Sequence, residues 1–410
     1  MDAAELDAAD PLARFRDRFV LDDGDRIYLD GNSLGRLPKA TPERLAARLA
    51  EWGERLIGGW DDWIELPFQV GDLLGRAALG ARPGEVVLSD STTVNLYKLA
   101  SAALSIRPGA VVTDTANFPT DRYVLEGLAA AHGRELRRFE SDPVEGPTAD
   151  DVHAACRHGA ALVSLSHVNY RSGALAGMAA ITEAAHAAGA LVLWDLSHSA
   201  GSVEVRLDGT GADLAVGCTY KYLCGGPGAP AFLYVREPLQ DELRSPIWGW
   251  FGQREQFAMG PDYDPESGIV RFLAGTPAVL DLTAVQVGAE LVEEAGIGAI
   301  RAKAEALTSY AVELHDAWLA PLGFELGSPR DPARRGAHVA LRHPEAWQVC
   351  RALIERAHVV PDFRGPDSIR FGLAPLTTSF AEVRDALARL RDLVSVGAHR
   401  EVDADPRRIT

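Results

Sequence analysis

The sequence predicts an α/β fold in which a large domain, built on a mostly parallel seven-stranded sheet, is followed by a smaller α+β domain. Between about residues 80 and 236, short apolar runs alternate with alanine-rich, helix-like stretches, as in parallel strands joined by crossover helices. After Thr276 the pattern changes to long amphipathic stretches and a few short strands. A chain of 410 residues also exceeds the size at which a single hydrophobic core stops growing.

Seven apolar runs in the first region are the expected strands of the sheet. Helix-like segments such as 178–188 separate them, and Gly189 can adopt the left-handed conformation that often follows a helix. The expected strands are residues 85–89, 110–113, 135–139, 161–165, 191–195, 213–217 and 230–235.

The second region is expected to form amphipathic helices over about 277–320 and a final helix over about 379–396. Short strands are expected at 323–326, 338–341 and 368–373, and Cys350 lies in a helical segment that is typical of a core. From these patterns we expect an N-terminal arm (1–55) that contributes to the small domain, a large domain (56–285) and a small C-terminal α+β domain (286–410).

Charge and composition exclude several classes of function. Lys and Arg total 41 against 58 Asp and Glu, and the formal net charge of −17 repels nucleic acid and anionic lipid surfaces. No apolar run reaches membrane-spanning length, and the N-terminal segment lacks the basic and apolar regions of a secretory signal. The four cysteines form no C-x-x-C pair, so no metal site is expected. We therefore expect a cytoplasmic protein that binds neither nucleic acid nor membrane.

Asp195 and Lys221 carry the strongest chemical signal. Asp195 ends the apolar run LVLWD, and Lys221 follows the next strand within GCTYKYLCGGPG. Ligands of open α/β sheets bind at the carboxyl ends of the strands, so both side chains are expected in one crevice. A lysine that forms an imine with an aldehyde, and a carboxylate that keeps a pyridine nitrogen protonated, are what pyridoxal 5′-phosphate requires.

Taken separately, each of these residues has a simpler interpretation. Asp195 can cap a helix, Lys221 can be a solvated loop residue, and His198 can be an ordinary structural histidine. The glycine-rich loop and the tyrosines on both sides of Lys221 favour the functional interpretation.

A phosphate site is predicted where the strand at 85–89 meets the next helix. Ser91, Thr92 and Thr93 supply hydroxyls beside the free N–H groups of a helix start, although simple N-capping explains the same pattern. In the segment NFPTDRY, Phe118 is placed to stack on a flat cofactor and Asp121 to meet its polar groups, although Phe118 alone is more typical of a core.

Seven collinear motifs resemble the kynureninase family over essentially the whole chain. The resemblance implies the fold type I architecture of pyridoxal phosphate enzymes and a homodimer with active sites at its interface. The motifs are YLDGNSLGRLPK (28–39), NFPTD (117–121), SHVNYRSG (166–173), WDLSHSAG (194–201), GCTYKYL (217–223), GWFG (249–252) and IRFGLAPL (369–376).

The resemblance also implies roles for individual residues. Lys221, Asp195 and Tyr220 would be catalytic, as the Schiff-base lysine, the partner of the pyridine nitrogen and a proton carrier beside the phosphate. Arg370 would hold the substrate α-carboxylate, because a buried guanidinium needs an anion, while Trp60 and Asn32 would also contact substrate. The implied cofactor-binding residues are Thr92, Thr93, Phe118, Pro119, Thr120, Asp121, Ser166, Asp195, His198, Tyr220, Lys221, and, across the dimer interface, Trp250 and Thr276.

The implied reaction is hydrolysis of the Cβ–Cγ bond of L-kynurenine, 3-hydroxykynurenine or a ring-modified analogue, releasing an anthranilate and L-alanine in tryptophan catabolism and NAD biosynthesis. Departures from the family pattern at Gln253, Thr377 and a short loop after Trp60 lie near the expected aryl end and leave ring preference open. One alternative is another enzyme of the same fold, either an aminotransferase or a desulfurase, and the desulfurase would need Cys224 or Cys350 as its reactive thiol. The other alternative is a catalytically silent binding protein.

Overall fold

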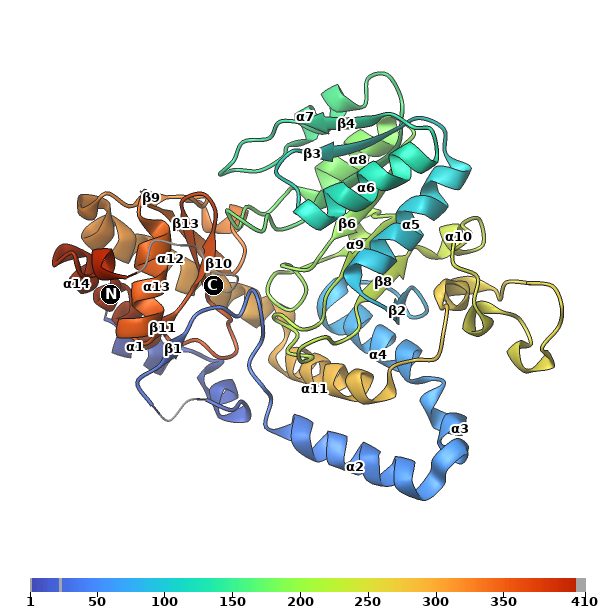
Figure 1. Ribbon diagram of the computed structural model, residues 1–410, viewed down its shortest axis with the longest axis horizontal. Coiled ribbons are helices and arrows are strands. Elements are labelled where there is room, and N and C mark those ends of the chain that lie inside the picture. Colours follow the sequence, from blue (N-terminus) through green and yellow to red (C-terminus); the bar gives the residue numbers. More distant parts are fainter. Residues whose placement is uncertain (1, 22–23, 403–410) are drawn as a thin grey trace.

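The computed structural model describes residues 2–21 and 24–402. Its large domain contains a seven-stranded sheet in the order β2-β8-β7-β6-β5-β3-β4, beside a smaller domain (Figure 1). β8 runs in the direction opposite to the other six strands, which are parallel to one another, so the predicted mostly parallel sheet of seven strands is confirmed. The strands are β2 (Val86–Leu88), β3 (Ala110–Asp114), β4 (Leu136–Phe139), β5 (Ala160–Ser166), β6 (Leu191–Asp195), β7 (Leu214–Gly217) and β8 (Phe232–Val235).

Both faces of this sheet are buried, which is why its central strands are continuous apolar runs instead of alternating ones. In β6, Leu193 belongs to the core beneath α5 (Thr92–Ile106) and α6 (Pro119–Ala131), whereas Val192 and Trp194 belong to the core on the opposite face. That second core includes residues of α4 (Leu66–Leu74), α8 (Met178–Ala187) and α11 (Val279–Ala295).

The register of the parallel strands aligns their carboxyl ends. Ser166 at the end of β5 pairs with Asp195 at the end of β6, and Asp195 pairs in turn with Val216 of β7. The loops that follow these strands, and the starts of α5 and α6, therefore meet at one edge of the sheet.

The small domain contains a four-stranded antiparallel sheet in the order β12-β13-β10-β9. The expected strands correspond to β9 (Glu325–Leu326), β10 (His338–Arg342) and β13 (Ser368–Gly372). The sequence analysis missed β12 (Asp362–Arg364) and the short parallel pair β1 (Ile27–Tyr28) and β11 (Val359–Val360), because two or three residues are too few to show a period. The helices of this part are α12 (Ile297–Leu314), α13 (Ala346–Arg356) and α14 (Phe380–Ser395).

The N-terminal segment contacts both parts of the molecule. Helix α1 (Ala3–Ala9) packs on α14 and β1 pairs with β11, whereas α2 (Ala40–Arg55) packs along α11 of the large domain (Figure 1). The domain boundaries given above stay predictions, and residues 1, 22–23 and 403–410 of those ranges lie outside the described residues. Within the described residues, we find no helix with the length and apolar character needed to cross a membrane.

Candidate active site

A cavity of about 200 Å³ lies at the carboxyl edge of the large sheet. Ten of its lining residues were singled out from the sequence, and Tyr170 and Ser197 are additions that sequence reasoning missed. The ten are Thr92, Thr93, Phe118, Thr120, Asp121, Ser166, Asp195, His198, Tyr220 and Lys221.

Lys221 is the lysine that lies in this cavity. The sequence contains four lysines; Lys98 and Lys303 are buried in ion pairs with Asp90 and Asp10, and Lys39 is exposed. The Lys221 amine therefore stands apart as the one positioned for chemistry on a bound carbonyl compound.

The Lys221 amine lies 3.0 Å from Nε2 of His198. Burial and the neighbouring Lys221 hold the pKa of His198 well below its usual range, so the imidazole is neutral and Nε2 can accept a hydrogen bond from the amine. The other ring nitrogen, Nδ1, is buried and has no hydrogen-bond partner among the described residues. His198 thus orients the amine and offers an unused polar group beside the cavity.

Two carboxyl groups, Asp195 and Asp121, meet on the cavity wall. The backbone N–H of Ser197 donates to Oδ1 of Asp195 over 2.7 Å and fixes that side chain at the end of β6. Burial and the negative charge of Asp195 raise the pKa of Asp121 well above its ordinary value, so Asp121 is the member that holds a proton. Its Oδ2 atom is buried without a partner in the described part of the chain.

The predicted phosphate site is the start of α5. Ser91 is its N-cap and accepts the N–H of Val94 over 3.4 Å, so the capping interpretation is correct for this residue. Thr92 and Thr93 are the first residues of the helix, where backbone N–H groups lack intrahelical partners and attract anions.

Lys98 holds this turn in place, a role that the sequence analysis missed. Its fully buried amine lies 2.8 Å from both Oδ2 of Asp90 and the backbone oxygen of Phe272. Asp90 needs such support, because its φ of 51° places a non-glycine residue in the left-handed region. A lysine within an otherwise apolar helical stretch was the available signal.

Asn117 builds the neighbouring corner of the cavity. Its Oδ1 accepts both the hydroxyl of Ser166 over 2.7 Å and the backbone N–H of Phe118 over 2.9 Å. Pro119 occupies the first turn of α6, where its fixed φ suits a helix start, and does not line the cavity. The Phe118 ring lies edge-on to Tyr170, with centroids 5.2 Å apart.

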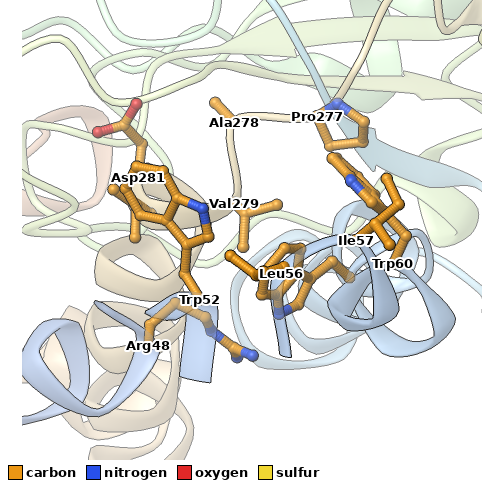
Figure 2. A pocket seen from close by; sticks show the side chains of 11 residues that line it. Arg48, Trp52, Leu56, Ile57, Trp60, Pro277, Ala278, Val279 and Asp281 are labelled. Atoms are coloured by element: carbon orange, nitrogen blue, oxygen red, sulfur yellow. The ribbon is translucent and has the colours of Figure 1, made fainter. Parts of the chain in front are cut away.

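Four of the proposed ligand-binding residues lie elsewhere in this chain. Trp60 lines a separate apolar pocket of about 530 Å³, which Figure 2 shows between the 48–60 segment and Pro277. Trp250 and Thr276 are exposed on the surface. Asn32 is buried against Gly372, and neither of its side-chain polar atoms has a partner among the described residues.

Arg370 is buried in β13, next to the cavity wall. Its Nε donates to Oδ1 of Asp362 over 2.7 Å, and its Nη1 donates to the backbone oxygen of Tyr170, a residue that lines the cavity. The anion that a buried guanidinium needs is thus supplied by the chain itself, namely by Asp362. The sequence analysis did not foresee this partner, because Asp362 lies on the missed strand β12. Arg370 can therefore bind a substrate carboxylate only through the guanidinium N–H groups that do not already donate to Asp362.

Comparison with known proteins places this geometry in a family. The kynureninase C-terminal domain matches residues 300–390, and the class-V aminotransferase family matches residues 76–337. A curated kynureninase from Pseudomonas fluorescens is 44% identical over 96% of this chain and 95% of that protein. A kynureninase from Burkholderia pseudomallei (strain K96243) is 42% identical over 97% of this chain and 96% of that protein.

The chain belongs to the kynureninase family. Solved structures at lower identity establish the fold type I architecture. A cysteine desulfurase from Thermococcus onnurineus NA1 has a TM-score of 0.79 at 20% identity, covering 96% of this chain and 98% of that one. A cystine C-S lyase, solved with its product cysteine persulfide, has a TM-score of 0.76 at 19% identity, covering 90% and 97%.

Two of the three departures from the kynureninase pattern, Gln253 and Thr377, lie outside the lining of the Lys221 cavity. Gln253 borders another surface pocket, and its Oε1 accepts the backbone N–H of Asp264 over 2.7 Å. Thr377 is buried, and its backbone oxygen accepts Arg16. Both departures leave the cavity around Lys221 unchanged.

Proposed function

We propose that this member of the kynureninase family hydrolyses the Cβ–Cγ bond of L-kynurenine to anthranilate and L-alanine, with pyridoxal 5′-phosphate in the Lys221 cavity. The main observation behind the proposal is that the Lys221 amine, the Asp195 carboxylate and the start of α5 all line one cavity. These groups suit an aldehyde, a pyridinium nitrogen and a phosphate, respectively. Asp121 and His198 line the same cavity, and each has a buried polar atom without a partner among the described residues, which leaves hydrogen-bonding capacity for a polar ligand.

The cofactor supplies an aldehyde to which amines attach and a ring that accepts electrons from the substrate. Lys221 would hold the cofactor through its amine and would move protons at the substrate carbon atoms. The Asp195 carboxylate would face the ring nitrogen and favour its protonated form, and Thr92 and Thr93 would bind the phosphate. Interaction with Cys218, together with burial, raises the pKa of Tyr220, so its hydroxyl keeps a proton that it can donate.

The chain's cysteines weigh against desulfurase chemistry, despite the structural likeness to desulfurases. A desulfurase of this fold needs a reactive thiol near the substrate. All four cysteines are buried, and burial raises the pKa of Cys224 to about 12 and that of Cys218 above its usual range. Thiols in such surroundings are mostly protonated and poorly reactive.

A second part of the proposal is a homodimer with shared active sites, in a cytoplasmic enzyme of tryptophan catabolism. Trp52, Leu56 and Ile57, with exposed fractions of 54%, 63% and 82%, border the apolar pocket of Figure 2 together with Trp60. Trp248 and Phe257 are also exposed on the segment that extends from the large domain. A contiguous exposed apolar surface such as the lining of the Figure 2 pocket is typical of a protein interface.

The homodimer would complete the active site. The family pattern assigns Trp250 and Thr276 to the cofactor, yet both are exposed here and neither lines the Lys221 cavity of its own chain. A twofold interface would let each subunit contribute these residues to the other subunit's cavity.

Mixed dimers test this arrangement. Pairing a Lys221→Ala subunit with a Trp250→Ala subunit places both defects in one composite site and leaves the other site intact. We expect purified mixed dimers to recover about half of the wild-type activity, although each variant alone is impaired. Mixed dimers no more active than the parent variants would show that each site is built within one subunit.

Steady-state kinetics tests the activity itself. We expect the holoenzyme to release anthranilate from L-kynurenine, and the ratio of kcat/KM for L-kynurenine and 3-hydroxykynurenine to define its ring preference. L-Cysteine is the control substrate, because sulfide release exceeding kynurenine cleavage would favour the desulfurase alternative.

A further inference from the structure

Asp362 lies at the centre of a buried ionic cluster between the N-terminal segment and the small-domain sheet. It has no exposed surface, it accepts hydrogen bonds from Arg370 and from the hydroxyl of Ser33 over 3.0 Å, and it forms an ion pair with Arg364 over 2.8 Å. Asp362 and Arg370 are direct partners across the antiparallel pair β12 and β13. The register of these two strands therefore fixes the ion pair.

The contact between Asp362 and Arg370 uses one particular edge of the guanidinium. Nε donates to Oδ1 of Asp362, and Nη2 donates to Oδ2, which is a two-pronged contact on the Nε edge. A guanidinium has a second two-pronged edge, formed by Nη1 and Nη2. That edge meets weaker or neutral acceptors, namely the backbone oxygen of Tyr170 and, at 3.4 Å, the hydroxyl of Ser33.

The Tyr170 contact places this second edge next to the Lys221 cavity, because Tyr170 lines that cavity. The His198 ring, which contacts the Lys221 amine, also feels the positive charge of Arg370. A carboxylate bound at the Nη1/Nη2 edge would replace neutral acceptors with a charged one, which strengthens the hydrogen bonds.

The cluster carries an excess of positive charge that one more anion could balance. Burial and the nearby Asp362 raise the pKa of Asp30 to about 7, so this carboxyl is substantially protonated at neutral pH. The two guanidiniums of Arg364 and Arg370 then face the single carboxylate of Asp362. The remaining positive charge is balanced when an external carboxylate binds.

We propose that Asp362 is a positioning residue: by occupying the Nε edge of Arg370, it holds the Nη1/Nη2 edge toward the cavity, where that edge binds the α-carboxylate of the substrate. This inference rests on the proposed function, since it assumes an amino-acid substrate. Asp362 itself does not contact the substrate. Its effect passes through the orientation of Arg370.

Two small probes isolate this effect. L-Alanine is the product that carries an α-carboxylate, and ethylamine is the same molecule without it. Binding of each to the holoenzyme is measured from the change in cofactor absorbance. We expect Asp362→Asn, whose amide N–H₂ opposes the guanidinium donors, to weaken L-alanine binding by about 10-fold or more and to leave ethylamine binding unchanged.

The double variant Asp362→Asn with Arg370→Ala shows whether the effect passes through Arg370. We expect it to bind L-alanine no more weakly than Arg370→Ala alone, because the two residues act as one unit. Asp367→Asn is the matched control: Asp367, in the turn between β12 and β13, pairs with Arg342 of β10 over 2.9 Å in a more exposed position. Its probe affinities should equal those of the wild type.

Ser33→Ala provides a milder second variant if thermal unfolding shows that Asp362→Asn is poorly folded. It removes one hydrogen bond to Asp362, so L-alanine affinity should fall by a smaller factor and ethylamine affinity should stay the same. Equal weakening of both probes, or additive losses in the double variant, would overturn the positioning role. Wild-type holoenzyme that binds neither L-alanine nor L-kynurenine would overturn the proposed function as well.

Discussion

Lys221→Ala is expected to lose the visible absorbance of the lysine-bound cofactor and at least about 10³-fold of its kynurenine turnover, because attachment and proton transfer depend on the same amine. The structure makes the effect specific, because the other three lysines are buried in ion pairs or exposed at the surface. Removing the Lys221 side chain opens space in a cavity and leaves the strands intact, so the thermal unfolding temperature should change little.

Borohydride reduction followed by peptide mapping checks this expectation. The wild type should carry the reduced cofactor on Lys221, and the Lys221→Ala variant should carry none. Lys39→Ala, which removes an exposed lysine, is the control and should retain both the label and the activity. A reducible adduct that persists in Lys221→Ala would contradict the assignment.

Asp195→Ala is expected to keep the cofactor in place but to lower kcat by about 10²-fold or more, because a fixed negative charge then no longer stabilises the protonated ring. Asp121 lies beside it but cannot simply replace it. Burial is the largest cause of the raised pKa of Asp121, and this cause still disfavours the ionised form of Asp121 after the charge of Asp195 is removed.

The Asp195→Ala variant is measured by kcat for L-kynurenine and by the pH dependence of the cofactor absorbance. The apparent pKa of the bound ring nitrogen should fall, since an opposite charge that favoured the protonated form has been removed. Asp121→Asn is the comparison variant, and its kcat should fall by a smaller factor than that of Asp195→Ala. Near-normal turnover in Asp195→Ala would mean that another residue holds the nitrogen.

Much of the fold and of the cavity was predictable, because the relevant signals are local. Asp195 ends a strand whose apolar run is unmistakable, and parallel pairing places Ser166 at its side. The turn before α5 and the glycine-rich loop after Lys221 are equally local patterns. Once the strands are assigned, the rule that ligands bind at strand carboxyl ends brings these residues together.

The residues that sequence reasoning missed depend on distant contacts. Asp362 lies on a three-residue strand, and its partners Arg370 and Ser33 are 8 and 329 positions away along the chain. Lys98 supports the phosphate turn partly through the backbone oxygen of Phe272, 174 positions further on. Periodicity and spacing carry no information about such pairs, because only tertiary packing creates them.

The central claim is hydrolytic cleavage of kynurenine, and isotope labelling tests it most directly. Turnover of L-kynurenine in ¹⁸O-labelled water should give anthranilate and L-alanine in equal amounts, because the Cβ–Cγ bond is broken by addition of one water molecule. One labelled oxygen should appear in the anthranilate carboxylate, since water adds at the γ-carbonyl carbon. Unlabelled anthranilate, or consumption of kynurenine with loss of its amino group and no alanine, would contradict the account.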